Sequence, residues 1–180
     1  MITVALSATI GATHERVWRA LVDPAERELW DERVLGQAAL SHRKKATRAS
    51  FRSAHETANK TPDKKSAIRN TRWRFKLGNI PLVMQDEIVE AERHERLVSR
   101  ISIGSMHFDQ TLTLHTENDE TGPRTRLGMK LIARNSIAVI GGVVPRLDVQ
   151  KIIIEYVDTT LRQVQKYCEA EAPSPRRDIS

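Results

Sequence analysis

Polar residues that could do chemistry or orient a bound molecule are few in this sequence. Gln110, Tyr156 and Thr160 occur among apolar neighbours of the same predicted strand or helix, so their side chains should face the interior. Asp86 is a further candidate, but apolar residues occupy both parities of residues 80–91, and the pattern leaves the direction of its carboxylate open. General acid–base catalysis needs such groups to converge within hydrogen-bond reach of a substrate. Because no convincing pair emerges, the sequence favours binding over catalysis.

Histidines, cysteines and short motifs give no stronger indication of chemistry. His107 shares its parity with polar residues of the same predicted strand and should face solvent. No HExxH, P-loop or GxGxxG motif is present. The single cysteine, Cys168, excludes an intrachain disulfide, and the absence of a Cys or His cluster in the sequence argues against structural zinc. The sequence therefore predicts no catalytic set, no metal and no cofactor.

Periodicity predicts the elements that must position the interior residues. Residues 70–78, NTRWRFKLG, alternate between a cationic parity with Arg72, Arg74 and Lys76 and an apolar parity with Trp73 and Phe75. Successive strand side chains point to opposite faces, so one face should be basic and the other buried. Strands are predicted at 2–10, 33–42, 46–54, 70–78, 80–91, 96–103, 105–115 and 124–133, with a loop at 54–69. Short polar turns between the later strands favour an antiparallel meander.

Helices are predicted after the first strand and again after the last strand of the sequence. Thr13 should cap a first helix, and Asp23 a second one, with Glu26 completing a capping box. From Pro145 to about Ala172, apolar residues recur every three or four positions, which indicates a long amphipathic helix. This order predicts an α+β fold in which a curved antiparallel sheet wraps around the C-terminal helix, with two short helices after the first strand.

Length and composition favour one soluble domain. The 180 residues are 39% hydrophobic and 29% charged. No signal peptide is evident, and the longest apolar run, residues 137–145, has less than half of the roughly 20 residues that a membrane span needs. We therefore expect a single domain over residues 1–172, a disordered tail at 173–180, and a cytoplasmic location. Packed core is the favoured interpretation of 137–145; a gate or a membrane-touching lip is the alternative.

Positive charge is concentrated between residues 41 and 76. This segment has twelve Lys or Arg against Glu56 and Asp63, or +10, which leaves −4 for the rest of a chain whose net charge is +6. A solvated surface is the first interpretation, and an anionic membrane or acidic partner is the second. The residues that would contact such a partner are Arg43, Lys44, Lys45 and Arg48. Nucleic acid is disfavoured, because the few nearby aromatic residues are predicted to face inward and could not stack on bases.

Two stretches of the sequence resemble a known superfamily. ATIGATHERVWRALVDPAERELW (8–30) is similar to the opening of the SRPBCC superfamily, the START-like and polyketide-cyclase-like proteins, and IVEAERHERLVSRI (88–101) resembles its mid-chain strand, turn and strand. Arg93 and His94 stand where that family often has a pair of prolines. The resemblance implies a helix-grip fold enclosing a hydrophobic cavity between the sheet and the last helix. Members include lipid carriers, coenzyme Q-binding proteins, aromatase/cyclases, plant ligand binders and chaperone activators, so the fold alone does not give the function.

The residues expected to line such a cavity come from the predicted strands and the last helix. They are Trp73, Phe75, Met106, Phe108, Gln110, Leu112, Met129, Leu131, Ile153, Tyr156, Val157 and Thr160. An empty apolar cavity of about 300 Å³ would cost about 7 kcal/mol. A cavity of that size should therefore hold ligand or water, or open to solvent. Alternatively, Trp73, Phe75 and Phe108 fill the space, and the protein is then not a binder.

Three functions remain open from the sequence. The first is binding or transport of a small hydrophobic molecule, such as a lipid, an isoprenoid or a polyketide-like aromatic, without catalysis. The alternative is a polyketide cyclase/aromatase-like enzyme that uses the same cavity. The third is an interaction module that uses the basic surface of residues 41–76.

Overall fold

The computed structural model describes residues 1–38, 69–119, 122–134, 137–138 and 147–170. The elements are β1 (Ile2–Ile10), α1 (His14–Val22), α2 (Pro24–Trp30), β2 (Val34–Gln37), β3 (Arg69–Leu77), β4 (Ile80–Glu92), β5 (Arg96–Ile103), β6 (Met106–Asp119), β7 (Gly122–Ala133), β8 (Ile137–Ala138), β9 (Leu147–Asp148) and α3 (Val149–Ala170). The predicted strand at 46–54, most of 137–145 and the tail at 173–180 lie outside these residues. The predicted loop at 54–69 also lies outside them except for Arg69, which begins β3.

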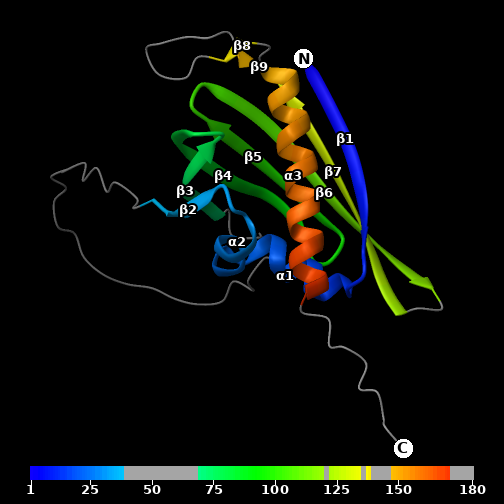
Figure 1. Ribbon diagram of the computed structural model, residues 1–180. Helices are drawn as coiled ribbons and strands as arrows, with labels where there is room; N and C mark the ends of the chain where they lie inside the picture. Colours follow the sequence, from blue (N-terminus) through cyan, green and yellow to red (C-terminus); the bar gives the residue numbers. More distant parts are fainter. Residues whose placement is uncertain (39–68, 120–121, 135–136, 139–146, 171–180) are drawn as a thin grey trace, which may run out of the picture.

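Seven strands form one antiparallel sheet in the order β1-β7-β6-β5-β4-β3-β2. Figure 1 shows that this sheet is curved and that α3 lies across one of its faces, with α1 and α2 near the C-terminal end of α3. The two-stranded pair β8-β9 lies at the opposite end of α3 (Figure 1). The α+β class, the meander and the helix against a curved sheet are confirmed.

The alternation in β3 places its two kinds of side chain on opposite faces of the sheet. Trp73 and Phe75 are 2% and 0% exposed and face α3, whereas Arg74 and Lys76 are exposed on the other face. Cross-strand partners continue the buried face, because Trp73 pairs with Met84, which is also fully buried. The apolar parity of this strand therefore forms part of the core, as the sequence predicts.

The two short helices begin at the predicted caps, although one detail of the prediction is wrong. Thr13 Oγ1 accepts a hydrogen bond from the Arg16 amide, and Asp23 Oδ1 accepts one from the Ala25 amide at 2.9 Å. Glu26 does not complete a capping box: its carboxylate pairs with the guanidinium groups of Arg16 and Arg19. The helix-capping signal was correct, but arginines of the preceding helix compete for the Glu26 side chain.

Replacing Asp23 with alanine should lower the free energy of unfolding by about 1 kcal/mol, because the Ala25 amide at the start of α2 would lose its acceptor. Urea unfolding monitored by circular dichroism measures this loss. Asp23→Ser is the matched control and should retain most of the stability, since a serine hydroxyl also caps helices. Equal stability of the alanine and serine variants would contradict the assignment of the cap.

The last helix begins later than the periodicity indicates. The sequence predicted it from Pro145, but Leu147 and Asp148 form β9 and the helix begins at Val149. Asp148 Oδ1 accepts a hydrogen bond from the Lys151 amide at 3.2 Å and so acts as the cap. The apolar stripe of α3 is buried as predicted, including Ile153 and Val157 at 0% exposure. No helix in the described part of the chain has the length and apolarity that crossing a bilayer requires.

Candidate functional site

A buried ion pair joins α2 to the centre of the sheet. The Arg27 Nη1 atom lies 2.6 Å from Asp86 Oδ2, and the Arg27 Nε atom lies 3.6 Å from Asp31 Oδ2 at the end of α2. All three side chains are buried. The Arg27 guanidinium also lies over the rings of Trp73 and Trp30, at 5.4 and 6.0 Å from their centroids. The direction of Asp86, which the sequence left open, is therefore inward, towards α2.

A second arginine, Arg33, connects Asp31 to α3. Arg33 Nε donates to Asp31 Oδ1 at 2.8 Å, while its Nη atoms donate to the Tyr156 carbonyl at 3.2 Å and to Thr160 Oγ1 at 2.8 Å. Its guanidinium carbon lies 4.5 Å from the centroid of the Tyr156 ring and 5.5 Å from that of Phe75. Arg33 therefore holds one turn of α3 against the strands.

Tyr156 is the point at which the two arginines meet. Its hydroxyl accepts a hydrogen bond from Arg27 Nη2 at 3.4 Å. Burial raises the pKa of the Tyr156 phenol, although Arg27 and Arg33 partly oppose this. Burial alone would lower the pKa of Arg27, but Tyr156, Asp86 and Asp31 more than compensate and raise it. At neutral pH the site thus contains a charged guanidinium beside a protonated phenol, both of which can donate hydrogen bonds to an oxygen atom.

Four buried polar atoms in or near this pair have no hydrogen-bond partner among the described residues: Arg27 Nε, Asp86 Oδ1, Trp73 Nε1 and Ser99 Oγ. Buried polar groups are nearly always paired, and leaving one unpaired costs about 1 to 3 kcal/mol. Ser99 lies opposite Gln110 on the neighbouring strand, and both side chains are buried. The interior is therefore polar at its centre and has unused hydrogen-bonding capacity.

A small cavity lies between this polar centre and α3. Its volume is about 30 Å³. It is lined by Leu21, Arg27, Trp30, Asp86, Ile88, Leu97, Gln110, Leu112, Tyr156 and Thr160. A cavity of this size holds about one water molecule, whereas ligand pockets are typically about 300 Å³ or more. Trp73, Phe75 and Phe108, which the sequence suggested as possible plugs, are all buried. Among the described residues, the space at this polar centre is therefore too small for a ligand.

An open groove lies on the other side of Tyr156. Its volume is about 240 Å³, and it runs between α3 and the strand end at Leu77, with Ile152 and Arg33 also on its wall. Tyr156 lines both this groove and the interior cavity. The aromatic side chain of Tyr156, held by Arg33, is therefore the partition between the two spaces.

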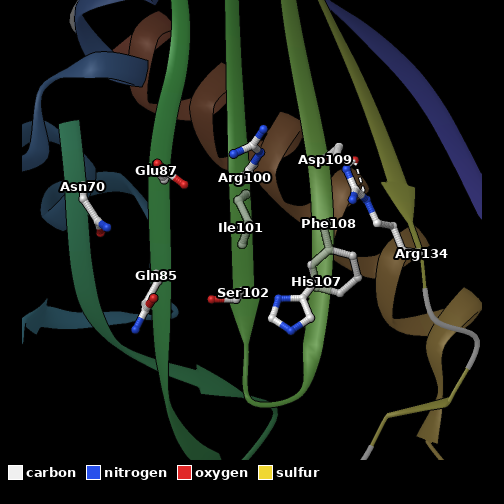
Figure 2. Close-up of a pocket in the computed structure, with 10 residues that line it drawn as sticks. All are labelled: Asn70, Gln85, Glu87, Arg100, Ile101, Ser102, His107, Phe108, Asp109 and Arg134. Carbon is white, nitrogen blue, oxygen red and sulfur yellow. Dashed lines mark hydrogen bonds and ion pairs between the residues drawn. The ribbon is translucent and has the colours of Figure 1, made fainter. Parts of the chain in front are cut away.

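A wider hollow of about 650 Å³ lies on the face of the sheet that points away from α3. Figure 2 shows its polar side chains in front of the strands, with α3 behind them. Asn70, Glu87, Arg100 and Asp109 are successive cross-strand partners, and Asp109 pairs with Arg134 at 2.7 Å. The two carboxylates and two guanidinium groups balance one another, so these side chains give the hollow no net charge to select an ionic ligand. His107 is exposed on this face, as predicted.

The structure brings only some of the predicted ligand-binding residues to the interior cavity. Gln110, Leu112, Tyr156 and Thr160 line it. Trp73 lies beside the Arg27–Asp86 pair. The remaining predicted residues are buried core residues that do not line this cavity: Phe75, Met106, Phe108, Met129, Leu131, Ile153 and Val157. Arg27, Asp31 and Arg33 were not predicted from the sequence, because nothing in the local pattern in or just after the short helix shows that these charged side chains turn inward.

Only the end of the basic segment belongs to the described chain. Arg69 donates to the Val22 carbonyl at 2.8 Å, and Arg74 donates to the Leu35 carbonyl at 2.9 Å. Both arginines thus support the backbone of neighbouring elements. The proposed partner-binding residues Arg43, Lys44, Lys45 and Arg48 lie outside the described residues.

Solved structures with the same architecture are numerous, although no family model and no curated protein matches the sequence. A START superfamily protein from Mycobacterium smegmatis is 12% identical with a TM-score of 0.65, over 94% of this chain and 99% of that one. The Zhui aromatase/cyclase from Streptomyces sp. R1128 is 12% identical with a TM-score of 0.66, over 93% of each chain. TTHA0849 from Thermus thermophilus is 19% identical with a TM-score of 0.61, over 95% of this chain and 99% of that one.

Similarity at this level of identity establishes the architecture and leaves the ligand open. All three structures match over at least 93% of this chain with TM-scores of 0.61 to 0.66. The protein therefore has a START-like helix-grip fold.

Proposed function

We propose that the protein binds a small hydrophobic molecule that carries at least one oxygen-containing polar group. The polar group would meet Arg27, Asp86 and Tyr156, and the apolar body would lie between the sheet and α3. The observation that carries this proposal is the buried, incompletely paired ion cluster beside a cavity in the middle of an otherwise apolar core. Among the similar structures, a START superfamily protein and an aromatase/cyclase are consistent with it.

Stability alone does not account for this cluster. Replacing a buried ion pair by apolar residues of similar volume is often neutral or stabilising, because the charges lose their hydration. Titratable groups buried together next to a cavity are accordingly candidates for a functional site. Asp86 Oδ1 has no partner among the described residues, so it can accept a hydrogen bond from a ligand hydroxyl. Arg27 and Tyr156 supply donors for a ligand carbonyl, carboxylate or phenol.

Binding requires the interior to open. A cavity of about 30 Å³ does not accommodate a lipid, an isoprenoid or an aromatic polyketide. Tyr156 separates it from the groove of about 240 Å³, so movement of this side chain with its turn of α3 would join the two spaces. A ligand that binds only the open form would shift the population towards that form.

Removing the Tyr156 hydroxyl should weaken ligand binding about fivefold, the equivalent of one hydrogen bond of about 1 kcal/mol. The probe is dansyl-labelled undecanoic acid, a hydrophobic carboxylate, titrated by fluorescence into wild-type protein and Tyr156→Phe. The other tyrosine of the chain provides the matched control, because Tyr167 packs under Arg16 and does not line the cavity. Tyr167→Phe should bind the probe as tightly as wild type.

Native mass spectrometry of the purified full chain complements this titration by detecting any molecule that copurifies with it. A bound species of defined mass in wild type that is depleted in Tyr156→Phe, together with saturable probe binding, supports the proposal. If the wild-type protein neither carries a molecule nor takes up the probe, the interior is only a packed core. An equal loss of probe affinity in Tyr156→Phe and Tyr167→Phe would also contradict the assigned site.

An enzyme of the polyketide cyclase/aromatase type is the second candidate, and one observation favours it. A protonated phenol on Tyr156 lies within hydrogen-bond reach of the Arg27 guanidinium, the arrangement needed to donate a proton to an oxygen atom and to stabilise negative charge there. Turnover of a poly-β-ketone substrate that is lost in Tyr156→Phe, while the probe still binds, would establish catalysis. Probe binding without turnover in wild type would leave the carrier function.

A further inference from the structure

A histidine and a glutamate that are neighbours in the sequence meet a second, distant histidine at one end of the sheet. His14 and Glu15 begin α1, and His94 lies in the turn between β4 and β5. One ligating atom from each of the three side chains lies within 4.8 Å of the other two. None of the three lines the interior cavity or the groove beside it. We propose that His14, Glu15 and His94 form a binding site for a divalent transition metal, with Zn²⁺ as the first ion to test.

The donor set suits such an ion. Imidazole nitrogen and carboxylate oxygen are typical zinc ligands at about 2.0 to 2.2 Å, which places the ligand atoms of a tetrahedral site about 3.3 Å apart. His14 Nε2 and Glu15 Oε1 are already 3.0 Å apart. The ring of His94 lies 5.2 Å from that of His14, centroid to centroid. Its ligating atom is within 4.8 Å of the other two, compared with about 3.3 Å in a tetrahedral site, so a shift of about 1.5 Å or less would complete the site. Three protein ligands leave a fourth position for water.

A neighbouring threonine orients the first histidine. Thr116 Oγ1 on β6 lies 3.4 Å from His14 Nδ1. If Nδ1 carries the proton and donates it to this oxygen, the lone pair of Nε2 faces the Glu15 carboxylate. Two electron-rich atoms 3.0 Å apart repel each other unless a proton or a metal ion lies between them. A second hydrogen-bond partner of this kind is a usual feature of metal-binding histidines.

The turn between β4 and β5 fixes the direction of the His94 side chain. His94 has φ of 67°, and it is the only non-glycine residue with positive φ in the described part of the chain. Asparagine, aspartate and histidine are the side chains that adopt this conformation most readily, so the turn accommodates a histidine here. The imidazole lies beside that of His14 and packs edge-on against the Trp18 ring at 6.0 Å between centroids, and its Nε2 atom accepts a hydrogen bond from Arg93 Nε at 3.3 Å.

The electrostatic environment suggests a modest affinity. The start of α1 carries a partial positive charge, which disfavours a cation. Glu15 offsets this, because its carboxylate is negatively charged at neutral pH and a backbone hydrogen bond lowers its pKa. The three side chains are partly or fully exposed, so the ion needs no opening of the structure to reach them. We expect a dissociation constant in the micromolar range.

Isothermal titration of ZnCl₂ into the full chain, prepared without a polyhistidine tag, tests the site. His94→Asn should weaken the tightest binding by at least about tenfold, and Thr116→Val by about tenfold, since loss of an outer hydrogen bond to a ligand typically costs 10- to 100-fold in affinity. His107→Asn is the control: His107 is exposed on β6 but is not part of the cluster, and its loss should leave the affinity unchanged.

Thermal unfolding distinguishes loss of the metal site from loss of the fold. Zn²⁺ should raise the Tm of wild type and of His107→Asn, because it binds the folded state, but not that of His94→Asn. Without metal, His94→Asn should be at least as stable as wild type, since asparagine tolerates the positive φ. Wild-type zinc affinity in His94→Asn, or the absence of saturable binding in wild type, would overturn the proposal.

Discussion

Arg27→Met should lower the free energy of unfolding by about 3 to 5 kcal/mol, the expected cost of removing one partner from a buried ion pair. Arg27 pairs with Asp86 at 2.6 Å and approaches Asp31, and all of these side chains are buried. Methionine keeps the length and the apolar part of the side chain, so the loss reports the uncompensated carboxylate of Asp86 and not a large cavity. Urea unfolding at neutral pH, with the slope compared between variants, gives the difference.

Two further variants isolate the cause of this loss. In the double variant Arg27→Met/Asp86→Leu both charges are absent, and most of the lost stability should return, because Asp31 keeps its contact with Arg33 at 2.8 Å. Arg96→Met removes an ion pair with Glu90 whose side chains are nearly half exposed, and should cost no more than about 1 kcal/mol. If Arg27→Met cost as little as Arg96→Met, water would have to reach the interior pair.

The second large effect is expected on α3. Ile153→Ala should cost about 2 to 5 kcal/mol, because Ile153 is fully buried and its truncation leaves a cavity between α3 and the sheet. The next residue provides an unusually close control. Ile154 is 44% exposed on the same helix, so Ile154→Ala should change stability by no more than about 0.5 kcal/mol.

Both substitutions have the same helix propensity and the same change in volume, so their difference measures the packing of the helix against the sheet. Chemical denaturation of the two variants in parallel gives this difference directly. Similar losses at both positions would mean that α3 is not held in the position described.

The fold could be predicted from the sequence wherever one face of an element is buried and the other is not. In β3, Trp73 and Phe75 alternate with exposed Arg74 and Lys76, and this pattern gave the strand and its orientation. β1 shows the limit of the rule. Leu6 shares the apolar parity of its strand but is 41% exposed, on a strand at the edge of the sheet. Alternation indicates a face but not how completely it is covered.

The candidate site was predicted only in part. Tyr156, Thr160 and Gln110 were identified because they interrupt apolar patterns, and they do line the cavity. Arg27 and Arg33 were missed, since an arginine next to a short helix is usually solvated. Their interior partners are Asp86, 59 positions from Arg27, and Thr160, 127 positions from Arg33. Contacts at such separations depend on how α2 packs against the sheet, which local periodicity does not contain.

The order of strands has a consequence for how the protein is made. Among the described strands β1 pairs only with β7, and Ile2 lies opposite Ala133, so within this sheet β1 has no partner until the ribosome has added about 130 more residues. At about 5 to 20 residues per second this takes about 7 to 26 s. During that interval the N-terminal strand of the nascent chain is an unpaired edge. The pairing of β1 with β7 is then a late step of folding, which takes place at release from the ribosome or afterwards.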